Sequence, residues 1–168
     1  IDFFIATCCR SVTYLLHTLV MKIIRQITIL GSTGSIGEST LDVIARHPDR
    51  FQTFALTANN NVEKMLLQCQ RFRPRYAVML DTQSAQQLTE AAKATGLNTE
   101  VLSGIESLEK VAAHPEVHAV MAAIVGAAGI RPAFAAARAG KLILLANKET
   151  LVMAGRIFID LVKQNNAT

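Results

Sequence analysis

The sequence predicts an α/β protein with a Rossmann-like, doubly wound, mainly parallel sheet and helices on both faces. Three observations predict this class. Short apolar or β-branched runs alternate with longer stretches of helical period from Met21 onward, a pattern typical of βαβ units. A glycine-rich turn stands between the first strand and the first helix. Half of the residues are apolar and 18% are charged, as expected for one domain with a buried sheet.

The first unit begins with a strand at residues 24–30 and continues through the glycine turn into a helix at 35–46. Ile36, Val43 and Ile44 recur at helical spacing, so we expect them to share the buried face. The helix then leads directly into a second strand.

The middle units repeat this order. We expect strands at 51–57, 76–80 and 100–102, alternating with helices at 62–72, 82–95 and 105–113. The asparagine run at 59–61 makes a turn and supplies an N-cap for the helix that follows it. In that helix Cys69 falls on the apolar face, which places it in the core.

The last units contain the most apolar strand and two further helices. The run 117–125 predicts a central strand that is covered on both faces. A small-residue turn at 126–129 follows, and Pro132 fits the first turn of an alanine-rich helix that ends at Gly140. The remaining elements are a strand at 141–146, a loop at 147–149 and a helix at 150–164.

Residues 1–20 differ from the rest, because they are hydrophobic and end just before the first β-strand pattern. Their apolar run at 12–20 is too short and too polar to span a bilayer. We therefore expect a leader-like or extraneous extension at 1–20, one cofactor-binding domain at 21–168, and no membrane partner.

The charge and the cysteine content exclude several functions. The net charge is +4, and the seventeen lysines and arginines are scattered rather than clustered. This distribution argues against a nucleic-acid partner and favours small anionic molecules as ligands. Cys8, Cys9 and Cys69 lack the spacing of a metal or redox site. A reducing compartment, the cytoplasm, is the expected location.

The glycine turn is the strongest functional signal. Gly31, Gly34 and Gly37 lie between a strand and a helix, where glycines allow a tight turn and let backbone amides approach a pyrophosphate. The helix N-terminus adds unpaired N–H groups, and the hydroxyls between the glycines, Ser32 among them, add donors. The alternative is that the glycines only make a tight connection.

Two further loops bear on the ligand. NAD-selective domains carry an acidic residue after the second strand, but residues 57–61 offer none, which favours NADP over NAD. The alternative is that these asparagines are turn formers only. Asn147, Lys148 and Glu149 supply an amide, a cation and a carboxylate in succession. These groups could bind the ribose or the amide of a cofactor and an anionic group of the substrate. A capped, charged loop with Glu149 near the start of the final helix explains them equally well.

These motifs resemble the 1-deoxy-D-xylulose 5-phosphate reductoisomerase family. The resemblance is carried by residues 27–37, 120–129 and 144–152, and also by residues 74–78. Their order and separation are similar along essentially all of 21–168. The resemblance implies an NADPH enzyme of the non-mevalonate isoprenoid pathway, of which this chain would be the NADPH-binding domain.

The resemblance also implies roles for individual residues. Thr33, Gly34, Ser35 and Ile36 would hold the cofactor phosphates, and the turn of Asn59, Asn60 and Asn61 would lie at the adenosine ribose phosphate. Asn147 and Glu149 would contact NADPH, and Lys148 would contact the sugar phosphate substrate. Many relatives have a glycine and a basic residue where this chain has Asn59 and Asn60, so the resemblance does not specify how this chain would contact the 2′-phosphate.

In this family 1-deoxy-D-xylulose 5-phosphate is rearranged at a divalent metal, magnesium or manganese, and then reduced by NADPH to 2-C-methyl-D-erythritol 4-phosphate. The family's Asp-Ser-Glu metal motif does not occur in this sequence. No catalytic or metal-binding residue is therefore assigned to it; the metal-binding, catalytic and C-terminal domains would lie outside it, and the full-length protein is expected to be a homodimer. The chain by itself is expected to bind NADPH without turnover. The alternatives are another NADP-linked dehydrogenase domain and a non-catalytic nucleotide-binding domain.

Overall fold

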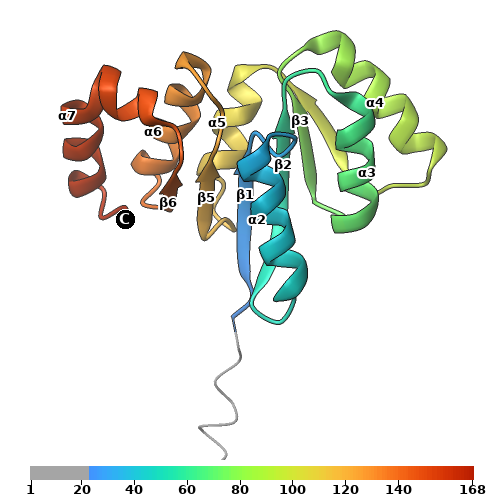
Figure 1. Cartoon of the computed structure of the whole chain (residues 1–168), viewed down its shortest axis with the longest axis horizontal. Helices are drawn as coiled ribbons and strands as arrows, with labels where there is room; N and C mark the ends of the chain where they lie inside the picture. The colour runs from blue at the N-terminus through green and yellow to red at the C-terminus, as the bar shows by residue number, and fades with distance from the viewer. Residues whose placement is uncertain (1–22) are drawn as a thin grey trace, which may run out of the picture.

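The computed structural model describes residues 23–168, so the predicted extension at 1–20 lies outside the described residues. Within them the chain alternates strands and helices throughout (Figure 1). The strands are β1 (Arg25–Leu30), β2 (Phe51–Ala58), β3 (Tyr76–Met79), β4 (Glu100–Ser103), β5 (Ala119–Ala122) and β6 (Leu142–Leu145). The helices are α2 (Ser35–Arg46), α3 (Val62–Phe72), α4 (Thr82–Ala94), α5 (Ile105–Ala113), the short 3₁₀ turn η1 (Ala127–Gly129), α6 (Ile130–Arg138) and α7 (Lys148–Gln164).

The strands form one sheet in the order β4-β3-β2-β1-β5-β6, and every neighbouring pair is parallel. All carboxyl ends therefore lie at one edge, which is the upper edge in Figure 1. The strand order reverses between β1 and β5, because the chain builds outward from β1 on one side and then restarts at β5 on the other. In open α/β sheets this switch point is where ligands bind.

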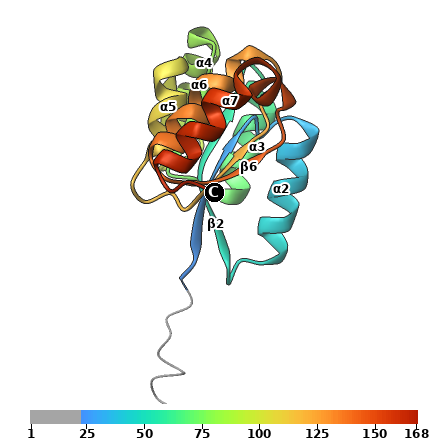
Figure 2. The ribbon, with the colours of Figure 1, turned by 90° about the vertical axis from the view of Figure 1, so that its left-hand side faces the viewer.

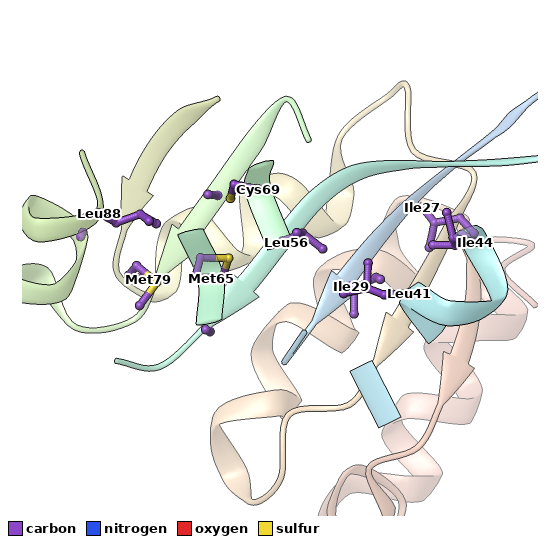
Figure 3. Close-up of a cluster of buried hydrophobic side chains, with 13 residues drawn as sticks. Ile27, Ile29, Leu41, Ile44, Leu56, Met65, Cys69, Met79 and Leu88 are labelled. Atoms are coloured by element: carbon purple, nitrogen blue, oxygen red, sulfur yellow. The ribbon is translucent and has the colours of Figure 1, made fainter. Parts of the chain in front are cut away.

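Helices cover both faces of the sheet, which confirms the predicted fold class. Apolar side chains of α2, α3 and α4 form one core with the strands, and those of α5 and α6 form the other. Figure 2 shows α2 on one side and α5, α6 and α7 on the opposite side. In the first core, Ile29 and Leu56 of the strands lie among Leu41 and Met65 of the helices (Figure 3).

The buried face of α2 differs from the predicted one. Ile36 and Val43 are 43% and 50% exposed, whereas Leu41 and Ile44 are buried. The reason is that Gly37 lies against the backbone of the preceding turn, so the helix turns residues 37, 41 and 44 toward the sheet. Spacing alone does not distinguish this face from the neighbouring one.

Two predicted boundaries were also wrong. β5 covers only 119–122 rather than 117–125, since Gly126 adopts a left-handed φ of 76° and the chain leaves the sheet before it. Residues 147–149 are not a loop: α7 begins at Lys148, with Asn147 as its N-cap. The prediction that Cys69 lies in the core is confirmed, and its burial raises the pKa of the thiol to about 12.

The outermost strand on one side of the sheet, β6, makes one further contact. The amide of Ile143 donates to the carbonyl of Thr168 at 2.7 Å, and the amide of Thr168 donates to the carbonyl of Lys141 at 3.2 Å. These bonds flank Leu142 on β6, which is the pattern of two parallel strands. Within 23–168, no helix is long and apolar enough to cross a membrane.

Candidate functional site

The glycine turn after β1 is packed too tightly to accept side chains at two positions. Gly31 has a φ of 84°, and a Cβ added to it would lie 2.9 Å from the carbonyl oxygen of Ala123. A Cβ on Gly37 would lie 2.6 Å from the Cα of Ser32. The turn is therefore pressed between the start of α2 and the segment that follows β5, at the switch point of the sheet.

Buried hydrogen bonds hold this turn in place. The amide of Gly31 donates to the hydroxyl of Thr57 at 2.9 Å, and the amide of Ser32 donates to the Thr57 carbonyl at 2.8 Å. The Ser32 hydroxyl donates to Gln68 on α3 at 2.7 Å, and the Gln68 amide donates back to the Ser32 carbonyl at 2.9 Å. The expectation that Ser32 offers its hydroxyl to a ligand was wrong, because that group is buried and bonded inside the protein.

The N-terminus of α2 keeps free donors beside the turn. Gly34 is its N-cap and provides no side chain to bond the first amides. The first amides of a helix have no partner within the helix and carry its positive dipole end. Gly34, Ser35 and Ile36 are exposed, and Thr33 is half-buried. The four residues predicted to hold phosphates are thus accessible at a helix N-terminus, a place at which anions can bind.

The turn after β2 contains the three predicted asparagines. Asn61 caps α3 by accepting the amide of Lys64 at 3.1 Å, as predicted. Asn59 and Asn60 are exposed and border a shallow cavity of about 490 Å³ at the start of α4. Its lining is entirely polar: Asn59, Asn60, Asp81, Gln83, Ser84 and Gln87.

Asn147 joins the segment after β5 to the start of α7. Its side-chain nitrogen donates to the carbonyls of Ile124 at 2.5 Å and Gly126 at 3.1 Å, and its oxygen accepts the amide of Thr150 at 3.3 Å. The side chain is buried, and Gly129 has no room for a Cβ, which would lie 2.7 Å from the Ile124 carbonyl oxygen. This side chain therefore helps to fix the segment after β5, which forms the rim of the sheet next to the glycine turn.

Lys148 and Glu149 follow in the first turn of α7, so the alternative interpretation of a capped helix start describes their local structure correctly. Lys148 is exposed and forms no ion pair with any residue of 23–168, whereas Glu149 is half-buried. A free ammonium group at a helix N-terminus, on the edge that also holds the glycine turn, can receive an anionic ligand.

Replacing Asn147 with Ala is expected to lower the free energy of unfolding by about 2 kcal/mol, because the helix loses its cap and two carbonyls lose a donor. Urea unfolding measures this change. Asn61→Ala is the matched control: it removes an exposed cap of the same type and is expected to cost about 1 kcal/mol. Equal losses in the two variants would show that the bonds to Ile124 and Gly126 contribute nothing.

The sequence and the fold of this chain are both similar to those of known proteins. The sequence profile described as 1-deoxy-D-xylulose 5-phosphate reductoisomerase matches residues 27–155, which include the glycine turn and the start of α7. The chain belongs to this family.

Individual reductoisomerases are similar over the same region. The enzyme of Nitrosomonas eutropha is 72% identical over 148 residues, which are 88% of this chain and 36% of the relative. The enzyme of Nitrosospira multiformis is 68% identical over 88% of this chain and 38% of the relative. The chain thus spans little more than a third of the length of the reductoisomerases it matches.

Solved reductoisomerases share the fold. A DOX-P reductoisomerase in complex with NADPH, fosmidomycin and magnesium superposes with a TM-score of 0.84 at 46% identity, covering 86% of this chain and 35% of that chain. The reductoisomerase of Zymomonas mobilis in complex with NADPH gives a TM-score of 0.82 at 43% identity, covering 86% of this chain and 38% of that one. Membership in the family argues against the alternative of an unrelated NADP-linked dehydrogenase.

Two groups important for the site were missed by the sequence analysis: the Thr57 hydroxyl and the Gln68 amide, which anchor the glycine turn. Gln68 did give a signal, since it is a polar residue next to Cys69 on the buried side of α3. Metal ligands were not expected in this chain. Across residues 23–168, no three His, Cys, Asp or Glu side chains come close enough to hold a metal ion, so the described residues do not fit the metal of the family.

Proposed function

We propose that this chain is the NADPH-binding part of a 1-deoxy-D-xylulose 5-phosphate reductoisomerase. The full-length enzyme would convert this sugar phosphate into 2-C-methyl-D-erythritol 4-phosphate in the non-mevalonate isoprenoid pathway. The observation that carries the proposal is the uncapped N-terminus of α2, placed by a glycine turn at the switch point between β1 and β5. The close approaches at Gly31 and Gly37 fix the backbone of the turn beside the first amides of α2, as expected of a glycine-rich turn that binds a pyrophosphate.

In this proposal the chain's residues bind and orient the cofactor. The amides of Ser35 and Ile36 donate to phosphate oxygens, and Thr33 and Gly34 form the wall of the turn. The asparagine turn at 59–61 holds the adenosine ribose with its phosphate. Asn147 positions the rim at which the nicotinamide lies, and Glu149 contacts NADPH from the first turn of α7. Bound NADPH supplies the hydride for reduction of the substrate.

Lys148 is proposed to bind the phosphate of the sugar substrate. Its ammonium group is exposed at the N-terminus of α7, so charge and helix dipole act together on an anion there. A substrate phosphate held at this point lies on the same edge of the sheet as the glycine turn. That arrangement brings substrate and cofactor to one rim and leaves chemistry at the sugar to groups outside this chain.

The remaining parts of the proposal concern the full-length protein. Its divalent metal, magnesium or manganese, would be held by residues other than 23–168, and the chain alone is expected to bind NADPH without converting the sugar phosphate. The full-length enzyme is proposed to be a cytoplasmic homodimer that binds neither nucleic acid nor membrane. Conversion of substrate by the 168-residue chain would contradict the assignment of the chemistry to other segments.

The cofactor site is tested by replacing Ser35 with Glu and titrating both proteins with NADPH, following nicotinamide fluorescence. A carboxylate at the first position of α2 occupies the anion site and repels phosphate, so the Kd for NADPH is expected to rise at least roughly tenfold. The same charge favours the helix N-terminus, so thermal stability should be unchanged or higher.

Ser39→Glu is the matched control, because Ser39 lies one turn further along the exposed side of α2. This variant adds the same charge away from the first amides and is expected to change the Kd much less. If wild-type protein binds no NADPH, or if Ser35→Glu binds it as well as wild type does, the glycine turn is not the phosphate site.

A further inference from the structure

The last helix, α7, leaves several large apolar side chains in solvent. Of its seventeen residues, only Thr150 and Phe158 are buried. Val152, Met153 and Ile157 are 81%, 63% and 68% exposed. Single apolar side chains are common on protein surfaces, but several large ones on one helix usually mark a surface that another part of a protein covers.

A different side of α7 packs on the rest of the domain. Phe158 lies against Phe134 of α6, with 5.3 Å between the ring centroids, and Leu161 and Val162 pack on the same cluster. Figure 1 shows α7 at one end of the molecule, beyond α6. The apolar side chains that α7 exposes therefore face away from the domain.

α7 bends at Ala154, whose φ of −142° and ψ of 21° are not helical. The bend separates a first segment, residues 148–153, from the part of the helix that packs on α6. This first segment carries Lys148 at its start and the exposed Val152 and Met153 at its end. Whatever covers these apolar side chains also fixes the position of Lys148.

Lys148 indicates what has to approach this surface. In the proposed function Lys148 binds the substrate phosphate, and the groups that act on the sugar lie outside this chain, which spans little more than a third of the length of the reductoisomerases it matches. Reacting groups have to be in contact with the substrate. The part of the polypeptide that carries them therefore has to come against the first turns of α7, where the apolar side chains are exposed.

We propose that the apolar surface of α7, formed by Leu151, Val152, Met153 and Ile157, is the docking surface for the part of the full-length polypeptide that acts on the sugar. Burial of these side chains stabilises the assembled enzyme. It also holds the segment 148–153, and with it Lys148, in one position relative to the substrate. This inference rests on the proposed function, because it takes Lys148 as the group that binds the substrate phosphate.

Hydroxyl-radical footprinting with mass spectrometry tests the docking without a measurement of activity. Val152, Met153 and Ile157 are expected to react rapidly in the 168-residue chain. In a full-length enzyme that contains this sequence they are expected to react roughly fivefold more slowly, because side chains in the centre of an interface lose contact with water. Leu67 of α3 is the control: it is similarly exposed on the opposite face of the sheet, and its rate should be equal in the two proteins.

Val152→Asp tests what the docking does. In the 168-residue chain the carboxylate stays in water, so the Tm and the Kd for NADPH are expected to be unchanged. In the full-length enzyme it would lose water at the interface, so the Tm is expected to fall by roughly 5 °C. The KM for the sugar phosphate is expected to rise roughly tenfold, because Lys148 is no longer held in position, while the KM for NADPH changes little. Leu67→Asp is the matched control and is expected to be neutral in both proteins.

The outcomes separate this inference from the proposed function. Equal footprinting rates in the two proteins would overturn the docking surface, and so would a full-length Val152→Asp enzyme with the Tm and KM values of wild type. Protection that is lost when the full-length enzyme is diluted to monomers would assign the surface to a second copy and overturn the proposal as well. A full-length enzyme that shows the protection but does not reduce the sugar phosphate would instead refute the proposed function and leave the docking surface standing.

Discussion

Replacing Gly37 with Ala is expected to lower the free energy of unfolding by about 3 kcal/mol and the Tm by roughly 10 °C. The added Cβ would lie 2.6 Å from the Cα and 2.7 Å from the carbonyl carbon of Ser32. These are backbone atoms of a turn that is bonded to two other elements, so they cannot move aside cheaply. Urea and thermal unfolding measure the loss, and NADPH titration of the folded fraction should show weaker binding, because α2 must shift relative to the turn.

Gly34→Ala is the control within the same motif. A Cβ on Gly34 would meet nothing closer than the Gly31 carbonyl oxygen, at 3.5 Å, and its φ of −83° suits any residue. Its stability is expected to stay within about 0.5 kcal/mol of wild type. If both substitutions cost the same, the three glycines are interchangeable turn formers and the close contact at Gly37 does not matter.

Gln68→Leu is expected to cost about 3 kcal/mol, because it removes both hydrogen bonds between α3 and the glycine turn at a buried position. The Ser32 hydroxyl and carbonyl are left without these partners in the core. Leucine has a similar volume, so lost packing adds little to the change. Urea unfolding gives the stability, and the Kd for NADPH reports whether the turn keeps its shape.

A double-mutant cycle with Ser32→Ala isolates the side-chain bond. Once Gln68 is leucine, removing the Ser32 hydroxyl should recover part of the lost stability, because a buried donor without a partner disappears. Additive losses in the double variant would mean that Ser32 and Gln68 contribute independently, contrary to the geometry.

The order of strands and helices could be predicted because its signals are local. Each signal lies within a few residues of the element it defines. Examples are the apolar runs of β1 and β5, the Asn61 cap of α3, and the glycine turn before α2. The buried face of α2 could not be predicted in this way. It depends on the contact of Gly37 with the preceding turn, which exists only once the strand, turn and helix are packed together.

The candidate site was predicted to a similar extent and for the same reason. The glycine turn was visible as a pattern, but its anchors Thr57 and Gln68 lie 26 and 36 residues from the groups they hold. Asn147 was predicted as a ligand contact, yet its side chain bonds carbonyls more than twenty residues earlier. Asp81 lines the same cavity as Asn59 and Asn60 because β2 and β3 are neighbours in the sheet, which the sequence does not state.

The contact of Thr168 with β6 also changes the outermost strand of the sheet. The two bonds that flank Leu142 set the direction and register of the backbone at this point. An outermost strand otherwise exposes a row of unpaired amides and carbonyls, to which a strand of another molecule can add. The segment at Thr168 occupies part of that row on β6, so this stretch of the strand is protected from pairing with a second molecule.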